Sequence, residues 1–140
     1  MSIAYKLGDI SDLAALIKAG DELFDYPVKE HRAKEFLNDS RHHLFLAYDG
    51  QAVVGMASGL HYVHPDKDPS LFIDEVGVVD AYQSCGIGRE LVKKLVAYAR
   101  KELDCKEAWV LTDESNLAAQ KAYFAAGGKR EDEKFVLIEF

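Results

Sequence analysis

The residues best suited to chemistry lie in the stretch DAYQSCGIGREL, residues 80–91, between a hydrophobic and an amphipathic run. Glycine costs roughly 1 kcal/mol relative to alanine inside a helix, so Gly86 and Gly88 at a helix start indicate a turn or a ligand. The first amides of a helix lack internal partners and carry partial positive charge, and glycine lets a phosphate approach them. We therefore interpret residues 83–89 as a pyrophosphate-binding loop; the alternative is a glycine turn that binds nothing.

Two other phosphate-binding loops do not fit this stretch. A Walker A loop needs Gly-Lys-Ser/Thr, but Gly88 is followed by Arg89 and Glu90. The dinucleotide fingerprint needs a third glycine where Leu91 stands. The pattern that remains is Gln-x-x-Gly-x-Gly after a strand, which argues against a doubly wound nucleotide or flavin binder.

The elements around this loop are predicted from hydrophobic periodicity, caps and turn residues. Strands are predicted at residues 3–7, 71–79, 107–113 and 133–140, and a hairpin at 43–63 turns at Asp49-Gly50. Helices are predicted at residues 9–24, 29–39, 86–103 and 116–128. This order predicts one α/β domain over residues 1–140, a mixed sheet of the α+β kind with helices packed on both faces.

Composition limits the partners and the compartment. The net charge of −7 argues against nucleic-acid binding and is compatible with a cationic partner. The two cysteines, Cys85 and Cys105, are too few for a disulfide framework, which favours a reducing, cytoplasmic location. No apolar run approaches the roughly 18 residues of a membrane span, and the start MSIAYKLGDI lacks the features of a signal peptide. We expect no membrane partner.

Two motifs together resemble the GNAT superfamily of acyl-CoA N-acyltransferases. YQSCGIGRELV resembles that family's coenzyme A loop, Gln/Arg-x-x-Gly-x-Gly/Ala, and DESNLAAQKAYFAAGG is similar to its second signature, Asn, then Ala, then Tyr-x-x-x-Gly. The element order resembles the family fold, a mostly antiparallel sheet that splays at the acetyl-CoA strand. The runs HYVHPDKDPSLFIDEVGV and AWVLTDESNLAAQKAY look most like the aminoglycoside 3-N-acetyltransferase branch.

The resemblance implies an enzyme that moves acetyl from acetyl-CoA to a primary amine of a small, cationic, aminoglycoside-like or polyamine-like acceptor by direct attack. It implies no metal, and a homodimer is possible. The pantetheine arm would pair with strand 71–79 like an added strand. Ser84 and Cys85 stand where relatives often carry Arg or Lys, so Arg89, helped by Lys93 and Lys94, would supply the positive charge. The residues expected to bind the coenzyme are Val76, Gly77, Val78, Gln83, Ser84, Cys85, Gly86, Ile87, Gly88, Arg89 and Asn116.

Glu75 and Tyr123 are the predicted catalytic residues. An amine with a pKa near ~10 is mostly protonated at neutral pH, so a base helps directly or through water. Related enzymes often place a carboxylate at the position of Glu75, and strand alternation points Asp74 the other way. Tyr123 is the acid for the departing thiolate, seven residues and nearly two helical turns from Asn116. The alternatives are an exposed carboxylate pair and a core tyrosine. The amide near Val76 is the expected oxyanion donor.

Other chemistry is weaker in this sequence. Cys85 at a helix start would be nucleophilic, but it stands where the pyrophosphate should lie. The histidine pairs His42/His43 and His61/His64 do not make a metal site. We expect His61 and the loop 64–70 to line the acceptor pocket, and Trp109 and Phe135 to be core residues. The acidic residues that could attract a polyamine are Glu22, Asp25, Asp66 and Asp68. Alternative functions are a non-catalytic coenzyme A-binding regulatory module and acetylation of an amino acid or peptide amine.

Overall fold

The computed structural model describes residues 2–131 and 133–140, and it contains one mixed sheet with helices on both faces. The strands, in spatial order, are β1 (Ile3–Leu7), β2 (His42–Asp49), β3 (Ala52–Tyr62), β4 (Ser70–Val78) and β5 (Glu107–Val110). The helices are η1 (Ile10–Asp12), α1 (Leu13–Lys18), α2 (Glu30–Asn38), η2 (Asp80–Tyr82), α3 (Ile87–Glu102) and α4 (Leu117–Ala125). Neighbouring strands are antiparallel except β4 and β5, which are parallel. The predicted mixed α/β fold is confirmed.

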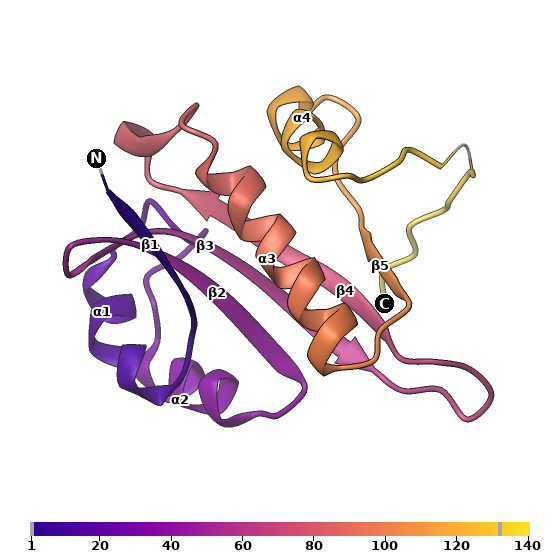
Figure 1. Cartoon of the computed structure of the whole chain (residues 1–140), viewed down its shortest axis with the longest axis horizontal. Helices are drawn as coiled ribbons and strands as arrows, with labels where there is room; N and C mark the ends of the chain where they lie inside the picture. Colours follow the sequence, from indigo (N-terminus) through magenta and orange to yellow (C-terminus); the bar gives the residue numbers. More distant parts are fainter. Residues whose placement is uncertain (1, 132) are drawn as a thin grey trace.

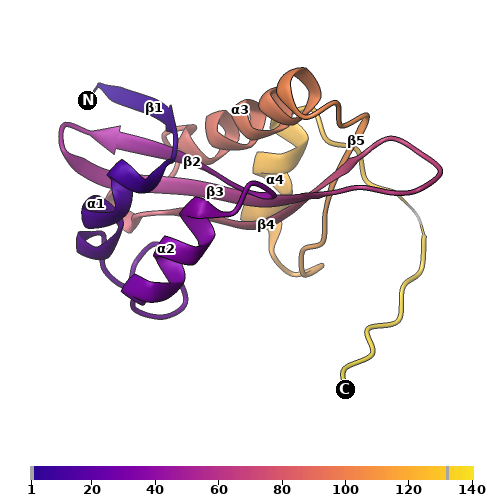
Figure 2. The same ribbon diagram turned by 90° about the horizontal axis from the view of Figure 1, so that it is seen from below.

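Two core layers lie on opposite faces of this sheet. Helix α3 covers one face, where Leu91 and Leu95 are fully buried, and α1 and α2 cover the other over β2 and β3 (Figure 1, Figure 2). Helix α3 lies close to β3 because Gly55 has no side chain: a Cβ there would come 3.0 Å from Ile87 and 3.1 Å from Leu91. None of the described helices is both long and apolar enough to cross a membrane.

The first predicted helix is wrong in its extent. Asp9 and Asp12 form a capping box around a 3-10 turn, and the helix that follows stops at Lys18 instead of Phe24. Gly20 has a φ of +75°, a left-handed conformation that glycine adopts without strain and that ends a helix. Leu23 and Phe24 still pack into the core, but from an irregular segment, which explains why their apolar pattern looked helical.

Strand β4 carries a bulge at the point where its acidic pair occurs. Ile73 lies opposite Gly59 and Glu75 lies opposite Ser58, so Asp74 is the extra residue. An extra residue resets the alternation of side chains. Ile73 before the bulge and Val76 after it both pack into the core below α3, so Glu75 lies on the other face. The expected alternation, with the side chains of Asp74 and Glu75 on opposite faces of a regular strand, is therefore interrupted by the bulge.

The predicted strand at 133–140 does not form within this chain. The described residues 133–140 have no strand partner, and Phe135, expected in the core, is 71% exposed. Trp109, the other expected core aromatic, is 37% exposed. The last element paired in the sheet is therefore β5, which also ends at Val110 instead of at Asp113. Residues 133–140 have the apolar pattern of a strand, but no neighbouring strand in the described part of the chain forms hydrogen bonds with their backbone.

Candidate active site

A tight turn leads from η2 into α3 and gives the predicted loop its shape. Ser84 and Gly86 both have left-handed backbones, with φ of +61° and +80°, and Gly86 is the N-cap of α3. The amide of Glu90 bonds to the carbonyl of Gly86, whereas the amides of Ile87, Gly88 and Arg89 lie in the first turn, where a helix supplies no acceptor. The turn therefore presents consecutive N–H groups at the positive end of a 16-residue helix.

The first residue of the motif and a tyrosine just before it hold this loop in place. The Gln83 amide donates to the carbonyl of Val78 at 3.1 Å and to the Asp80 carboxylate at 3.0 Å. The Tyr82 hydroxyl donates to the carboxylate of Asp49, the last residue of β2. Sequence reasoning assigned no role to Asp80 or Tyr82, because their partners become neighbours only in the fold. Gln83 thus ties the loop to the end of β4.

Arg89 supplies a positive charge at the turn. Its Nη2 lies 3.1 Å from the position that a Cβ on Gly86 would occupy, so the guanidinium folds back over the loop. Its Nε lies 3.7 Å from the Glu90 carboxylate, a pair that is partly exposed. Ser84 and Cys85 are both exposed and add no charge of their own. The loop can therefore contact an anion through backbone amides and one arginine.

The second half of β4 has a free edge beside this loop. Strand β5 pairs with β4 only along Ser70–Ile73, and from Glu75 to Val78 the described residues supply a partner on the β3 side alone. Gly77 is one of the residues expected to bind the coenzyme, and a glycine there could leave room for a ligand. Instead, a Cβ on Gly77 would lie 2.5 Å from the carbonyl of Leu23, so this glycine accommodates the segment between α1 and α2.

Three carboxylates gather around that half of β4. Burial raises the pKa of Glu75, and the negative charges of Asp74 and Asp25 raise it further. Asp25 comes from the irregular segment between α1 and α2, which crosses β4 at Gly77. The same segment lines a surface depression with Tyr26, Pro27, Val28 and Lys29. This arrangement can attract a cation and can accept a proton at Glu75.

Helix α4 brings the second motif to the same end of the molecule (Figure 1). Asn116 is the N-cap of α4, and its Oδ1 accepts a hydrogen bond from the Ala119 amide at 3.1 Å. The sequence analysis did not predict this capping role. Because the cap uses only Oδ1, the NH2 group of Asn116 can still donate a hydrogen bond to a ligand. Tyr123 is partly buried against the core below α3, and burial raises the pKa of its phenol. No described residue hydrogen-bonds to its hydroxyl.

The structure separates several residues that we expected to line the acceptor pocket. His61 bonds to His43 at 2.7 Å, and His43 packs against Tyr98 of α3, on the face of the sheet opposite Glu75. The loop with Asp66 and Asp68 precedes β4, whereas Glu75 follows five residues after the start of β4, which places about 17 Å of extended chain between them. Among residues 2–131 and 133–140, no three His, Cys, Asp or Glu side chains are placed so that they could hold one metal ion together.

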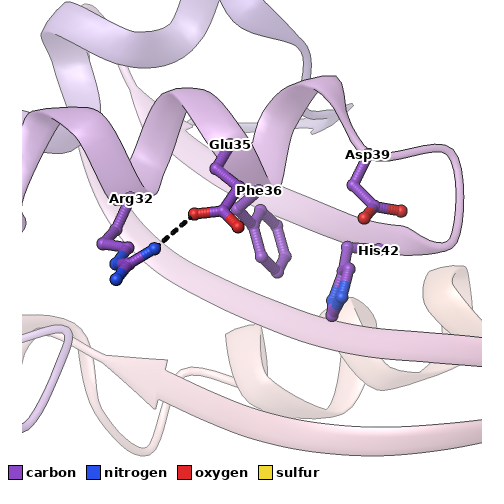
Figure 3. A pocket seen from close by; sticks show the side chains of 5 residues that line it. All are labelled: Arg32, Glu35, Phe36, Asp39 and His42. Atoms are coloured by element: carbon purple, nitrogen blue, oxygen red, sulfur yellow. Dashed lines mark hydrogen bonds and ion pairs between the residues drawn. The ribbon is translucent and has the colours of Figure 1, made fainter.

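A further depression lies between α2 and the start of β2, away from the loop and from Glu75. Figure 3 shows the side chains that line it: Arg32, Glu35, Phe36, Asp39 and His42. Arg32 and Glu35 pair across one helical turn at 2.7 Å, and the Phe36 ring stands 5.1 Å from the His42 ring. None of the predicted catalytic or coenzyme-binding residues lines this depression.

Comparison with known proteins agrees with this arrangement. Residues 12–127 match the Acetyltransferase (GNAT) family. The aminoglycoside acetyltransferase meta-AAC0020 from an uncultured soil metagenomic sample, solved with trehalose, has a TM-score of 0.83 at 19% identity, covering 99% of this chain and 95% of that chain. AAC(6')-Iy with a bisubstrate analogue has a TM-score of 0.83 at 18% identity, covering 100% and 99%.

A ribosomal-protein-alanine N-acetyltransferase from Brucella melitensis biovar Abortus 2308 has a TM-score of 0.80 at 16% identity, covering 99% of this chain and 100% of that chain. At these identities the likeness shows the fold. A comparison with curated proteins finds no match.

Proposed function

Because this chain belongs to the acetyltransferase (GNAT) family and is thereby an acetyl-CoA-dependent N-acetyltransferase, we propose that it acetylates a primary amine of a small cationic acceptor by direct attack. The observation that carries this proposal is the position of Glu75. It lies on β4 where β5 has parted from that strand, and Asp25 and Asp74 act on its pKa.

The coenzyme-binding part of the proposal rests on the loop and the free edge of β4. The amides from Gly86 to Arg89 would bind the pyrophosphate, and the Arg89 guanidinium would balance its charge. Backbone groups of Val76, Gly77 and Val78 would pair with the amides of the pantetheine arm as a neighbouring strand does. The NH2 group of Asn116 would hold the same arm from α4. These contacts favour one orientation of the bound molecule along β4.

Glu75 would remove the proton from the attacking amine, directly or through water. A base works best when its pKa is close to the working pH, and burial together with two neighbouring carboxylates raises the pKa of Glu75 in that direction. Asp25 and Asp74 would also attract the protonated form of the acceptor. The same three side chains therefore serve both recognition and proton removal.

Tyr123 would protonate the leaving group, the thiolate of coenzyme A. Bound acetyl-CoA supplies an activated thioester, whose thiolate needs a proton when it departs. Burial raises the pKa of Tyr123, so the phenol keeps its proton at neutral pH and is available as a donor. The Val76 amide would stabilise the negative charge that develops on the carbonyl oxygen.

Measurement of thiol release from acetyl-CoA over a panel of amines tests the proposed acceptor class. The panel contains aminoglycosides, polyamines, amino acids and peptides with a free N-terminus. We expect the highest kcat/KM with acceptors that carry two or more cationic amines, because their second charge can remain beside Asp25 and Asp74. Highest kcat/KM with single-charge amino acids or peptides would contradict the proposal.

A peptide amine is the second candidate acceptor, and the ribosomal-protein-alanine N-acetyltransferase among the structures of the same fold favours it. The family match does not favour the non-catalytic coenzyme A-binding module that the uncharged Ser84 and Cys85 suggested. The same panel separates the two acceptor classes, because each predicts a different amine with the highest kcat/KM.

A further inference from the structure

The hydroxyl of Ser58 is a buried polar group to which no step of the proposed reaction gives a role. Ser58 lies on β3 and is only 7% exposed. Its side chain points away from α3, because Ala57 and Gly59 on either side of it face the core below that helix. Glu75 on β4 lies directly opposite Ser58 in the register of the two strands, so the two side chains share this face of the sheet.

The Ser58 hydroxyl forms no hydrogen bond with another described residue, although a buried hydroxyl without a partner is costly. No polar side-chain atom in the described part of the chain is both closed off from solvent and unpartnered, so the Ser58 oxygen must reach a small opening. Ser70, a second buried serine, differs because its hydroxyl has the Glu107 carboxylate at 3.5 Å. The hydroxyl of Ser58 is therefore available to a water or a ligand atom.

This opening lies on the side of β4. The partner of Ser58 on β2 is Leu44, which is buried, and Met56 on the same face of β3 is buried as well. Helices α1 and α2 cover this face over β2 and β3 (Figure 2). Glu75, across the strand pair, is accessible to solvent. The Ser58 hydroxyl and the Glu75 carboxylate therefore border one space on the face opposite α3.

One water fits between these two groups. Residues directly opposite each other in an antiparallel pair have Cβ atoms roughly 4.5–5.5 Å apart. A water that bridges two polar atoms joins them over roughly 5–6 Å, which is two hydrogen-bond lengths. The side chain of Glu75 is longer than that of Ser58 by two bonds, so its carboxylate can lie further from the sheet than the hydroxyl. The outer side of such a water remains open to an amine above β4.

We propose that Ser58 is a positioning residue, whose hydroxyl holds, together with the Glu75 carboxylate, the water that carries a proton from the protonated acceptor amine to Glu75. The ammonium gives one proton to this water while the water gives another to the carboxylate. The products are a neutral amine, a carboxylic acid and an unchanged water, and the nitrogen then has the free electron pair that attacks the thioester. This inference rests on the proposed role of Glu75 as the base, and it selects transfer through water over direct transfer.

Carboxyl NMR of the protein without an acceptor tests the link between Ser58 and Glu75. A hydrogen bond through the water favours the charged carboxylate, so its loss should raise the pKa of Glu75. We expect Ser58→Ala to raise it by roughly one pH unit, while the burial and the charges of Asp74 and Asp25 that already raise this pKa stay the same. The matched control is Ser70→Ala, which should leave the pKa unchanged. Glu75→Gln identifies the resonance by its absence. An unchanged pKa in Ser58→Ala contradicts the proposal, whatever the acceptor is.

Thiol release from acetyl-CoA, with the amine of the panel that has the highest kcat/KM, tests the consequence for catalysis. Ser58→Ala should lower kcat roughly tenfold, the effect of one hydrogen bond to a charged group. Its KM for acetyl-CoA should stay nearly constant, and the acidic limb of its pH profile should move to higher pH together with the pKa of Glu75. Ser70→Ala should keep the wild-type kcat and profile. A wild-type kcat in Ser58→Ala would show that the hydroxyl takes no part in the reaction.

A double-mutant cycle decides whether Ser58 acts through Glu75. In a Glu75→Gln background, Ser58→Ala should lower kcat by less than about twofold, because the water then has no base to serve. A second tenfold loss in that background would mean that Ser58 acts independently, and the proposal would be wrong. A wild-type kcat in Glu75→Gln would refute the base itself and this inference with it. A slow Glu75→Gln beside a fully active Ser58→Ala would refute the inference alone and leave the proposed function in place.

Discussion

The guanidinium of Arg89 lies over the backbone of Gly86, with its Nη2 3.1 Å from the place of a Cβ at residue 86. Both residues therefore border the same region at the N-terminus of α3. Arg89 supplies a positive charge to that region, and Gly86, which has no side chain, leaves the backbone amides accessible. Substitution of either should therefore change coenzyme binding, each for a different physical reason.

Gly86→Asp should abolish the increase in melting temperature that acetyl-CoA causes. The aspartate adds bulk where Arg89 lies and a negative charge where a phosphate should bind, in a left-handed backbone with φ of +80°. The control is Gly20→Asp, which has a similar φ of +75° but nothing within 4 Å of its Cβ. Both variants should lose some stability, but Gly20→Asp should keep the shift with acetyl-CoA. Retention of the shift in Gly86→Asp would show that the loop is a turn without a ligand.

Arg89→Ala should weaken acetyl-CoA binding in calorimetry by roughly 10- to 100-fold, because a hydrogen bond to a charged group contributes roughly 1.5–3 kcal/mol. Lys93→Ala is the control, since Lys93 lies one turn further along α3 and contacts Glu90 at 3.9 Å. Its effect should be smaller. Equal losses in the two variants would indicate general attraction by the helix surface in place of a specific contact at the turn.

Tyr123→Phe should lower turnover by ~10²–10⁴-fold while coenzyme affinity and melting temperature stay nearly constant. The change removes the phenolic proton but keeps the ring that packs against the core below α3. Tyr98→Phe, which alters a tyrosine of α3 whose ring packs against His43, should retain full turnover. Full turnover in Tyr123→Phe would assign this residue to the core and leave protonation of the thiolate to water.

Because His43 is buried beside His61, we expect the free energy of unfolding to decrease in acid. Burial, His61 and His42 lower the pKa of His43 from 6.5 to about 4. Between pH 4 and 6.5 the unfolded chain therefore binds more protons than the folded chain. The contribution of neutral His43 to the free energy of unfolding is fully present above about pH 6.5 and is lost as the pH falls toward 4. The contribution is at most about 3.4 kcal/mol, at about 1.4 kcal/mol per pKa unit.

Melting temperatures from pH 4 to 7 measure this contribution. The wild type should lose stability over that range, and His43→Gln should have a flatter profile. His31→Gln changes an exposed histidine of α2 and should match the wild type. Identical profiles for all three proteins would exclude His43 as the titrating group.

Local signals predict much of this structure. The Asp49-Gly50 turn and the stripe of residues such as Leu91 and Leu95 are specified by neighbouring residues, and each forms as predicted. The stop at Gly20 is also a local signal, and it outweighs the apolar periodicity that continues to Phe24. The segment 133–140 has strand propensity but pairs with nothing in its own chain, because propensity does not supply a partner.

The site is predictable in its residue types but less so in its geometry. The Gln83–Arg89 motif identifies the turn. The hydrogen bond from Tyr82 to Asp49 and the effect of the Asp25 charge on the pKa of Glu75 each join distant parts of the chain, so a local pattern does not predict them. The bulge at Asp74 also depends on pairing with β3, so no pattern in β4 alone reveals it. The capping role of Asn116 is local, since its side chain accepts from the amide three residues on, and asparagine is a preferred N-cap residue.

The role of Glu75 as the base for the acceptor amine is the central claim, and the pH dependence of kcat/KM for thiol release in wild type and Glu75→Gln tests it most directly. At neutral pH the variant should be slower by ~10²–10⁴-fold, and the difference should narrow as the pH rises, because more of the amine is then neutral. Wild-type kcat/KM should fall in acid as Glu75 takes up a proton, at a pH above the ordinary range for glutamate, since burial and the charges of Asp74 and Asp25 raise its pKa. An equal loss at every pH would assign Glu75 to substrate positioning, and wild-type rates in Glu75→Gln would contradict the account.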